Sequence, residues 1–291
     1  MKLAWSLKKI NLMNTIMTDQ LKKKVEQAIR LLQSINNEEV ELAYSGGKDS
    51  DVILELAKMA GIKFRAIYKN TTIDPPITIK PVKSKGVEII RPKMNFALII
   101  EENGFPNQWK RFCCGELKEY KILDKAIQGI RKSESSIRKE RYKEPVMCRV
   151  YENGKAEIIY PILEWTNEDI AEFVNHYKVK CHPLYYDENG DFHPERRLGC
   201  MCCPLVSYNK RIKQFKQYPQ MVRYYIKNGE KWLKKHPETK TGKRHKTVYD
   251  WFLFDVFHRK IKNLEGKKRK TMFDEGIDAK YFLESYFNIK L

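Results

Sequence analysis

The sequence lacks several features that would place it in other classes of protein. None of its apolar stretches reaches the 18 or so uninterrupted residues that a membrane-spanning helix needs. The opening segment, residues 1–17, is broken by Lys8, Lys9 and Asn11 and has no small-residue cleavage site, so it does not resemble a signal peptide. No internal repeat or low-complexity tract occurs. We therefore expect a cytoplasmic protein with no membrane partner.

Two common phosphate-binding motifs are also absent, because neither GxxxxGK[ST] nor GxGxxG occurs. The chain instead has SGGKDS at residues 45–50, between an apolar run and a stretch with helical spacing. A strand, a glycine turn and a helix start leave backbone N–H groups free to face an anion, and the helix dipole adds positive potential. An ordinary turn with an Asp or Ser helix cap is the alternative. The order of the three parts favours a phosphate site, in which Lys48 offsets charge and the hydroxyls of Ser45 and Ser50 donate hydrogen bonds.

Strand-like and helix-like segments alternate along the first two thirds of the chain. The patterning predicts strands over 40–44, 64–68 and 87–90, and helices over 19–35, 51–60, 77–83, 94–102 and 116–128. Such alternation is typical of an α/β protein, here a Rossmann-like parallel sheet with helices on both faces. Ligands bind such sheets at the carboxyl ends of the strands, which would bring the loop at 45–50 beside the loop at 70–74.

Charge is unevenly distributed. The net charge is +19, and from residue 205 to the end there are 22 Lys and Arg against 9 Asp and Glu. Strand signals fade in this part, so we expect a basic, mainly helical C-terminal region. Two interpretations of this charge remain open. The region binds a polyanionic partner or an acidic substrate, or it is simply a solvated helical surface. The stretch 210–246, with 13 basic and 2 acidic residues, is the candidate nucleic-acid contact, its aromatic residues serving for packing or base stacking.

Five of the seven cysteines fall in two clusters. Cys113 and Cys114 are adjacent, and Cys200, Cys202 and Cys203 form the second group. Four thiolates suit a [4Fe–4S] cluster or a structural Zn²⁺, and an adjacent pair is unusual for zinc ribbons. Buried free thiols are the alternative, which we retain for the isolated Cys148 and Cys181.

Several motifs resemble one known family. SGGKDS is similar to the PP-loop signature of the ATP pyrophosphatase superfamily (PP-loop/HUP type), whose members cleave ATP between the α and β phosphates. Further stretches resemble those of the phosphoadenosine phosphosulfate (PAPS) reductase family: YKNTTIDPP (68–76), GIRKSES (129–135) followed by Arg138, PILEWT (161–166), HPLY (182–185) and RLGC (197–200). The resemblance spans about 36–206. We therefore predict an N-terminal helical segment over 1–35, a PP-loop domain over 36–206, and the basic region over 207–291.

The resemblance implies a set of functional residues and cofactors. ATP with Mg²⁺ would be bound by Ser45, Gly46, Gly47, Lys48, Asp49, Ser50, Asn70, Thr71, Asp74, Arg131 and Glu134. Lys48, Asp49 and Arg131 would be catalytic, and the guanidinium groups of Arg131 and Arg138 suit a sulfate or phosphate. A [4Fe–4S] cluster, with Zn²⁺ as the lesser alternative, would be held by Cys113, Cys114, Cys200 and Cys203.

One departure from the family bears on the reaction. Sulfonucleotide reductases of this family attack sulfur with a cysteine near the C-terminus, and no cysteine follows Cys203 here. Together with the intact PP-loop, this favours ATP-dependent adenylation coupled to sulfur transfer. The family's DNA-phosphorothioation sulfurtransferases imply nucleic acid and a sulfur donor protein as partners. The alternatives are a sulfonucleotide reductase that uses Cys202 or an external thiol, and a non-catalytic nucleotide or nucleic-acid binder.

Overall fold

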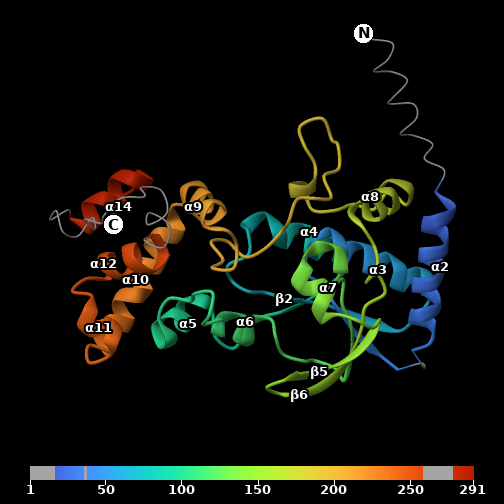
Figure 1. Cartoon of the computed structure of the whole chain (residues 1–291), viewed down its shortest axis with the longest axis horizontal. Helices are drawn as coiled ribbons and strands as arrows, with labels where there is room; N and C mark the ends of the chain where they lie inside the picture. The colour runs from blue at the N-terminus through green and yellow to red at the C-terminus, as the bar shows by residue number, and fades with distance from the viewer. Residues whose placement is uncertain (1–16, 36–37, 258–277) are drawn as a thin grey trace, which may run out of the picture. The chain divides into compact units, whose positions relative to one another are not determined.

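The computed structural model describes residues 17–35, 38–257 and 278–291 (Figure 1). Residues 1–16 of the predicted N-terminal segment and 258–277 of the predicted basic region lie outside this description. The chain divides into two compact units. The first consists of Met1–Asn70, Pro76–Arg91 and Tyr120–Leu198, and the second of Thr71–Pro75, Pro92–Glu119 and Gly199–Leu291. The three-part division expected from the sequence remains a prediction, and its boundaries differ from those of the two units.

A six-stranded sheet forms the centre of the first unit. Its strands lie in the order β3-β2-β1-β4-β6-β5, with the bounds β1 Val40–Ala43, β2 Phe64–Lys69, β3 Glu88–Ile90, β4 Lys125–Ile127, β5 Val146–Tyr151 and β6 Gly154–Ile159. All neighbouring pairs are parallel except β5 and β6, which form an antiparallel hairpin at one edge. The predicted Rossmann-like α/β architecture is thereby confirmed, with one antiparallel edge strand added.

The helices of this unit follow from local capping and apolar spacing. The Thr18 hydroxyl accepts the N–H of Leu21 at the start of the first long helix, and Thr166 and Asp169 form a capping box at the start of a later one. The helices are α2 Asp19–Gln33, α3 Lys48–Ala60, α4 Ile79–Ser84, α7 Ser136–Arg141 and α8 Asn167–His176, with short turns η1 Pro76–Thr78, η2 Lys132–Glu134 and η3 Pro183–Tyr185. Figure 1 shows α2, α3 and α8 packed side by side.

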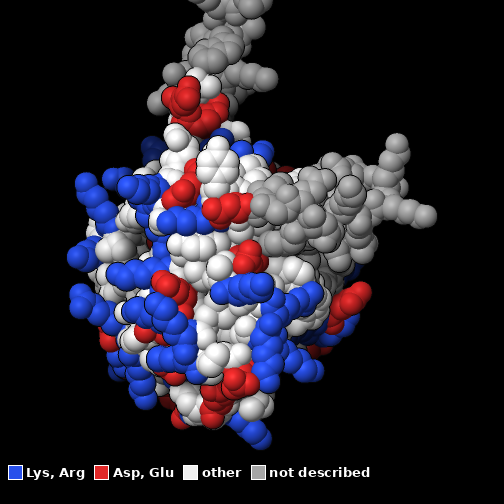
Figure 2. All heavy atoms as spheres, turned by 90° about the vertical axis from the view of Figure 1, so that its left-hand side faces the viewer, with Lys and Arg blue, Asp and Glu red and all other residues white. Residues whose placement is uncertain are grey.

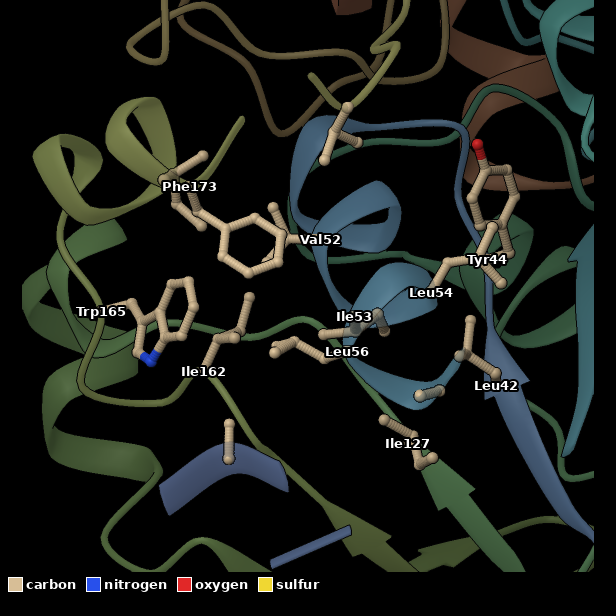
Figure 3. Close-up of a cluster of buried hydrophobic side chains, with 14 of the residues drawn as sticks. Leu42, Tyr44, Val52, Ile53, Leu54, Leu56, Ile127, Ile162, Trp165 and Phe173 are labelled. Atoms are coloured by element: carbon tan, nitrogen blue, oxygen red, sulfur yellow. The ribbon is translucent and has the colours of Figure 1, made fainter. Parts of the chain in front are cut away.

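Apolar side chains from α3, α8 and the sheet form the main core of this unit (Figure 3). Leu42 of β1 and Ile127 of β4 face Ile53 and Leu56 of α3, and all four side chains are buried. Trp165 and Phe173 pack edge to face, with ring centroids 5.5 Å apart. Each such side chain contributes about 1.5–3 kcal/mol by leaving water, so this core holds the start of α3 firmly against the end of β1.

The second unit is helical, as predicted for the basic region. Its helices are α5 Phe96–Asn103, α6 Phe112–Leu117, α9 Tyr208–Gln217, α10 Gln220–Lys235, α11 Lys240–Arg244, α12 Val248–Phe252 and α14 Ala279–Phe287, with a π-helical turn η4 at Leu253–Phe257. Aromatic rings fill its core: Phe105 stacks on Trp251 with centroids 3.9 Å apart, and Tyr225 packs against Phe96 and Phe215. Residues 92–119, which lie within the predicted PP-loop domain, belong to this unit.

The helix predicted over 116–128 is wrong. Only Phe112–Leu117 is helical there, and Lys125–Ile127 forms β4 between β1 and β6. The segment contains good helix formers, but Ala126 and Ile127 are buried and pair with residues of both neighbouring strands. Strand pairing of this kind overrides local propensity. The β5–β6 hairpin was not predicted from the sequence.

Candidate functional site

The N-terminus of α3 has the geometry of an anion site. The chain leaves β1 at Ala43 and turns through Gly46, whose φ of +76° lies in the left-handed region that favours glycine. Helix α3 begins at Lys48, and its N-cap residue is Gly47, which offers no side chain to cap the first N–H groups. Those N–H groups and the positive end of the helix dipole are therefore available to an anion.

A cavity of about 250 Å³ lies at this helix start. Its lining combines the glycine loop with residues from three other segments: Ala43, Ser45, Gly47, Asp49, Ser50, Gly129, Glu134, Arg138, Tyr185, Arg197 and Leu198. Ser50 donates its hydroxyl hydrogen bond to the Gly47 carbonyl (2.7 Å), and its oxygen lies 3.3 Å from that of Ser45. The cavity thus has hydroxyl groups at one wall and guanidinium groups at another.

Two arginines supply positive charge to this cavity. Arg197 donates to the backbone carbonyl of Glu134 at 2.6 Å, and the Glu134 carboxylate forms an ion pair with Arg138. Burial, and then the nearby charge of Arg197, lower the pKa of Arg138. The Glu134 carboxylate also lies 3.8 Å from Arg197, so one carboxylate is shared by two guanidinium groups, and a bound oxyanion would supply a second negative charge.

Arg131, predicted to contact the nucleotide, is held by the protein itself. Its side chain is 1% exposed. The guanidinium donates to the Asp49 carboxylate (2.7 Å), the Ser133 hydroxyl (3.0 Å) and the Asn167 side-chain carbonyl (3.0 Å). These bonds connect the start of α3 with the loop after β4 and the start of α8. In this structure Arg131 positions Asp49, and a direct contact with nucleotide stays a prediction.

Lys48 and Asp49 form a partly buried ion pair. The Lys48 ammonium lies 3.0 Å from the Asp49 carboxylate and 5.3 Å from the centre of the Tyr185 ring. Lys48 is 2% exposed, and this burial lowers its pKa despite the opposing charge of Asp49. Asp49 is thus balanced by two cations, Lys48 and Arg131. A metal ligand role for Asp49 would require it to exchange one of these partners.

The structure requires a glycine at position 129, the first residue of the GIRKSES stretch. A Cβ at this position would lie 2.9 Å from the backbone oxygen of Asp49, closer than real Cβ contacts come. The loop after β4 therefore approaches the first turn of α3 more closely than any side chain would permit. This close approach brings Glu134 and Arg138 to the cavity.

The loop at 70–74 is divided between the two units. Asn70 belongs to the first unit, where its N–H donates to the Ile90 carbonyl at 2.9 Å. Thr71 and Asp74 belong to the second unit. There the Thr71 oxygen lies 3.8 Å from the Cys200 sulfur, and the Asp74 carboxylate lies 3.8 Å from the Lys118 ammonium. Nucleotide binding by these three residues stays a prediction.

The second unit brings the four predicted metal-binding cysteines to one pocket. Its lining is Thr71, Ile73, Phe96, Cys113, Cys114, Leu117, Lys118, Cys200, Cys203, Pro204 and Tyr225. Four thiols around a largely apolar pocket are a donor set that fits a [4Fe–4S] cluster or Zn²⁺. Within the described ranges, however, no three or more His, Cys, Asp or Glu side chains are gathered closely enough to hold a metal ion as they stand. The thiols would have to draw together around a metal centre.

The pocket cysteines differ in pKa. Burial raises the pKa of Cys200 and Cys203, and the hydrogen bond with Cys114 raises that of Cys113, whereas the pKa of Cys114 is lowered. A hydrogen bond from Cys113 lowers the pKa of Cys114 to about 6; burial opposes this effect and Arg111 assists it. Burial raises the pKa of Cys200 to about 11. Although burial lowers the pKa of Lys118, the charges of Cys200 and Asp74 raise it overall. Arg111 and Lys118 thus provide positive charge beside thiol groups that a metal would deprotonate.

Cys202 differs from the other cysteines of its cluster. It is 1% exposed, belongs to the hydrophobic core of the second unit, and has a left-handed backbone with φ +55°. Its N–H donates to the Gln214 side chain at 3.1 Å, and burial raises the pKa of its thiol to about 12. A buried thiol with so high a pKa is a poor nucleophile.

Sequence reasoning missed several residues of the first site. Gly129, Tyr185 and Arg197 line the cavity, yet none had been assigned to the site. All three lie in the quoted motif stretches, and that position was the only available signal.

Within the described ranges, no helix is long and apolar enough to cross a membrane.

Comparison with known proteins identifies related sequences. Residues 39–206 match the family model described as phosphoadenosine phosphosulfate reductase domain. An uncharacterized 37.8 kDa protein of Escherichia phage 186 is 28% identical over 155 residues, covering 48% of this chain and 44% of that protein. An uncharacterized protein of Methanocaldococcus jannaschii is 25% identical over 203 residues, covering 65% of this chain and 47% of that protein. The chain spans less than half the length of these two relatives.

Three solved structures are similar at low identity. FMN adenylyltransferase of Candida glabrata has a TM-score of 0.42 at 14% identity, covering 63% of this chain and 66% of that one. A PAPS reductase of Candida auris in complex with phosphate has a TM-score of 0.39 at 16% identity, covering 62% and 98%. The U34-tRNA thiolase NcsA of Methanococcus maripaludis, with its [4Fe–4S] cluster, has a TM-score of 0.40 at 14% identity, covering 75% and 82%.

Proposed function

The chain belongs to the phosphoadenosine phosphosulfate reductase domain family, and on that premise we propose that it is an ATP-dependent adenylating enzyme coupled to sulfur transfer. An acceptor oxygen attacks the α-phosphorus of ATP, the bond to the β-phosphate oxygen breaks, and pyrophosphate leaves with the electron pair. A sulfur nucleophile then displaces AMP from the activated acceptor. A donor protein would supply the sulfur.

The cavity at the start of α3 is the observation that carries this proposal. An uncapped helix N-terminus, two serine hydroxyls and two arginines converge on about 250 Å³ of space. This combination suits a chain of phosphates, whose charge is spread over several oxygens. The N–H groups of α3 and the hydroxyls of Ser45 and Ser50 would hold one phosphate, and Arg138 and Arg197 another. Charge that develops on the leaving pyrophosphate would be stabilised by these same groups.

Mg²⁺ would accompany ATP and offset the charge of the pyrophosphate. Asp49 is the carboxylate of the glycine loop that lines the cavity. Its ion pairs with Lys48 and Arg131 hold it in place.

The thiol pocket is the proposed site of sulfur handling. Cys113, Cys114, Cys200 and Cys203 would hold a [4Fe–4S] cluster, which supplies an iron site that can bind or relay sulfur. Lys118 and Arg111 would balance the negative charge of the thiolates.

The burial of Cys202 weighs against the alternative of a sulfonucleotide reductase. Such a reaction needs a thiolate that can reach the sulfur of the substrate. Cys202 is enclosed in the helical core, and its raised pKa keeps it protonated near neutral pH. A reductase would therefore depend on an external thiol.

Nucleic acid is the acceptor that we propose, because the helices beside the thiol pocket carry an exposed basic surface. Lys210 and Lys213 of α9 and Arg223 and Lys227 of α10 are exposed. Figure 2 shows Lys and Arg side chains spread over the side where Figure 1 places α10, α11 and α14, with fewer Asp and Glu side chains among them. Such surfaces attract the phosphate backbone of nucleic acids.

Thermal unfolding with different nucleotides tests the proposal. A ligand at about 100 times its Kd adds about 2.7 kcal/mol to the free energy of unfolding. We expect Mg·ATP to raise the melting temperature, and adenosine phosphosulfate and PAPS to raise it less. Arg138→Gln should reduce the shift caused by Mg·ATP, because Arg138 lines the cavity.

Arg141→Gln is the matched control, since Arg141 is an exposed arginine of the same helix α7. It should respond to Mg·ATP as the wild type does. If only a sulfonucleotide raises the melting temperature, the reductase would be favoured over the adenylating function. If none of the three nucleotides raises it, the nucleotide site would be rejected.

A further inference from the structure

Trp109 is an exposed tryptophan in the loop that precedes the pocket cysteines Cys113 and Cys114. Its side chain is 66% exposed, which is unusual for a residue that is highly buried on average. It lies in the loop between α5 and α6, where the Asn107 side-chain oxygen accepts the N–H groups of Trp109 and Lys110, each at 2.9 Å. The local turn therefore holds the backbone of Trp109 in one conformation.

Both ends of this loop are anchored in the core of the second unit. Phe105 stacks on Trp251 before the turn, and after it α6 begins with Phe112 and the buried Cys113. Exposure of Trp109 is thus a property of a well-supported loop. The backbone that carries the indole is therefore already ordered, which reduces the entropy lost when a ligand stacks on the ring.

The loop leads directly into the thiol pocket. Arg111 follows Trp109 by two residues and pairs with Glu119 at 3.1 Å. Cys114 lines the pocket. Trp109, Lys110 and Arg111 therefore form one exposed aromatic and basic stretch immediately before the pocket cysteines.

Helix α9, one of the basic helices, is hydrogen-bonded to the loop that carries Cys200 and Cys203. Gln214 of α9 accepts the N–H of Cys202, and Arg211 of α9 donates to the Val256 carbonyl at 2.9 Å. The exposed lysines of α9 are thus held in a defined position relative to the loop that carries Cys200 and Cys203.

Three of the five Phe, Tyr and Trp side chains of the basic stretch 210–246 are occupied by packing. Phe215, Tyr225 and Trp232 are all buried in the core of the second unit. Of the two roles expected from the sequence, packing or base stacking, these three side chains therefore serve packing. An exposed aromatic group for stacking is supplied by Trp109.

We propose that Trp109 is a stacking platform for a base of a single-stranded nucleic acid, with the phosphates on Lys110, Arg111 and the exposed lysines of α9. The inference rests on the proposed function, since it names the acceptor as a nucleic acid with an unpaired base. Exposed aromatic rings beside cationic side chains are the general means of binding single strands.

Binding of fluorescent oligonucleotides tests the platform. We would measure the anisotropy of single-stranded DNA and RNA of about 12 nucleotides, within the range that single-strand sites cover. Stacking contributes about 1–3 kcal/mol per base, so Trp109→Ala should weaken binding by about 5- to 150-fold. Trp109→Phe should retain most of the affinity. The slope of log K against log salt should be the same for Trp109→Ala and wild type, because stacking releases no counterions.

Two controls separate stacking from charge and from damage to the fold. Tyr177→Ala removes an exposed aromatic side chain of the first unit and should leave binding unchanged. Lys213→Ala should reduce the magnitude of the slope of log K against log salt by about 0.7, because one phosphate contact is lost. Unchanged binding by Trp109→Ala, or a changed salt slope, would overturn the platform.

The thermal shift with Mg·ATP is measured on the same preparations. If Mg·ATP stabilises the protein and neither oligonucleotide binds at low salt, the platform is rejected and the nucleotide function stands. If Trp109-dependent binding occurs without any nucleotide shift, the platform stands and the adenylating function falls.

Discussion

Arg131 and Arg138 lie in one motif, yet their surroundings give them different roles. Arg131 is enclosed by Asp49, Ser133 and Asn167, which together satisfy most of its donors. A buried guanidinium without such partners would destabilise the fold strongly, so these bonds are structural before they are catalytic. Arg138 lines the cavity together with Arg197. Of the two arginines, Arg138 has the better position for an oxyanion.

His182 makes stability depend on pH. It is 2% exposed, its Nδ1 accepts the Leu184 N–H at 3.0 Å, and burial together with the charge of Lys85 lowers its pKa below 6.5. The unfolded chain therefore binds a proton more readily than the folded one. The free energy of unfolding should fall as the pH drops below about 6.5, with the neutral histidine favouring the fold at higher pH.

Urea unfolding at about pH 7.5 and about pH 5.5 measures this effect. In His182→Asn, whose side-chain oxygen can still accept the Leu184 N–H, the loss of stability between these values should be smaller. His176→Asn at the exposed end of α8 should behave as the wild type. An equal pH dependence in all three proteins would contradict the role of His182.

The junction between β4 and α3 shapes the cavity at the start of α3. Gly129→Ala would place a Cβ against the Asp49 carbonyl and push the first turn of α3 away. We expect a loss of about 1–3 kcal/mol in the free energy of unfolding and a weaker response to Mg·ATP. Gly199→Ala, where a Cβ meets nothing within 4 Å, is the control and should leave both properties unchanged. Normal Mg·ATP binding by Gly129→Ala would mean that the two segments can separate without affecting the site.

The cavity and the thiol pocket belong to different units, so loss of the proposed metal centre should destabilise the unit with the thiol pocket more than the other. Protein purified without oxygen should be brown and contain about four iron atoms per chain. Cys114→Ser should lose the iron and destabilise the helical unit, because metal binding contributes to the stability of the fold. Cys148→Ser, at an exposed position of β5, should retain the iron. A colourless protein with one zinc ion would exclude the iron–sulfur centre.

Local features of this protein could be predicted from its sequence. The glycine loop between a strand and a helix is one, although α3 begins at Lys48 and not at residue 51 as predicted. The same holds for α2, where the apolar spacing of Leu21, Val25, Ile29 and Leu32 predicts a helix; three of these side chains are buried and Ile29 is partly buried. The cysteine pattern of the resembled family indicated four thiols, and these four line one pocket. The family motifs indicated the segments that line the nucleotide cavity.

Long-range packing decided the rest. The segment 125–127 became β4 because it pairs between two strands that are distant in sequence, and no local pattern contains that information. Arg131 and Arg138 look alike in the sequence, and only their three-dimensional neighbours distinguish a buried anchor from a cavity residue. The same is true of Trp109 and Trp232. Burial depends on which surfaces meet when the chain folds, so only the tertiary structure shows which tryptophan faces the solvent.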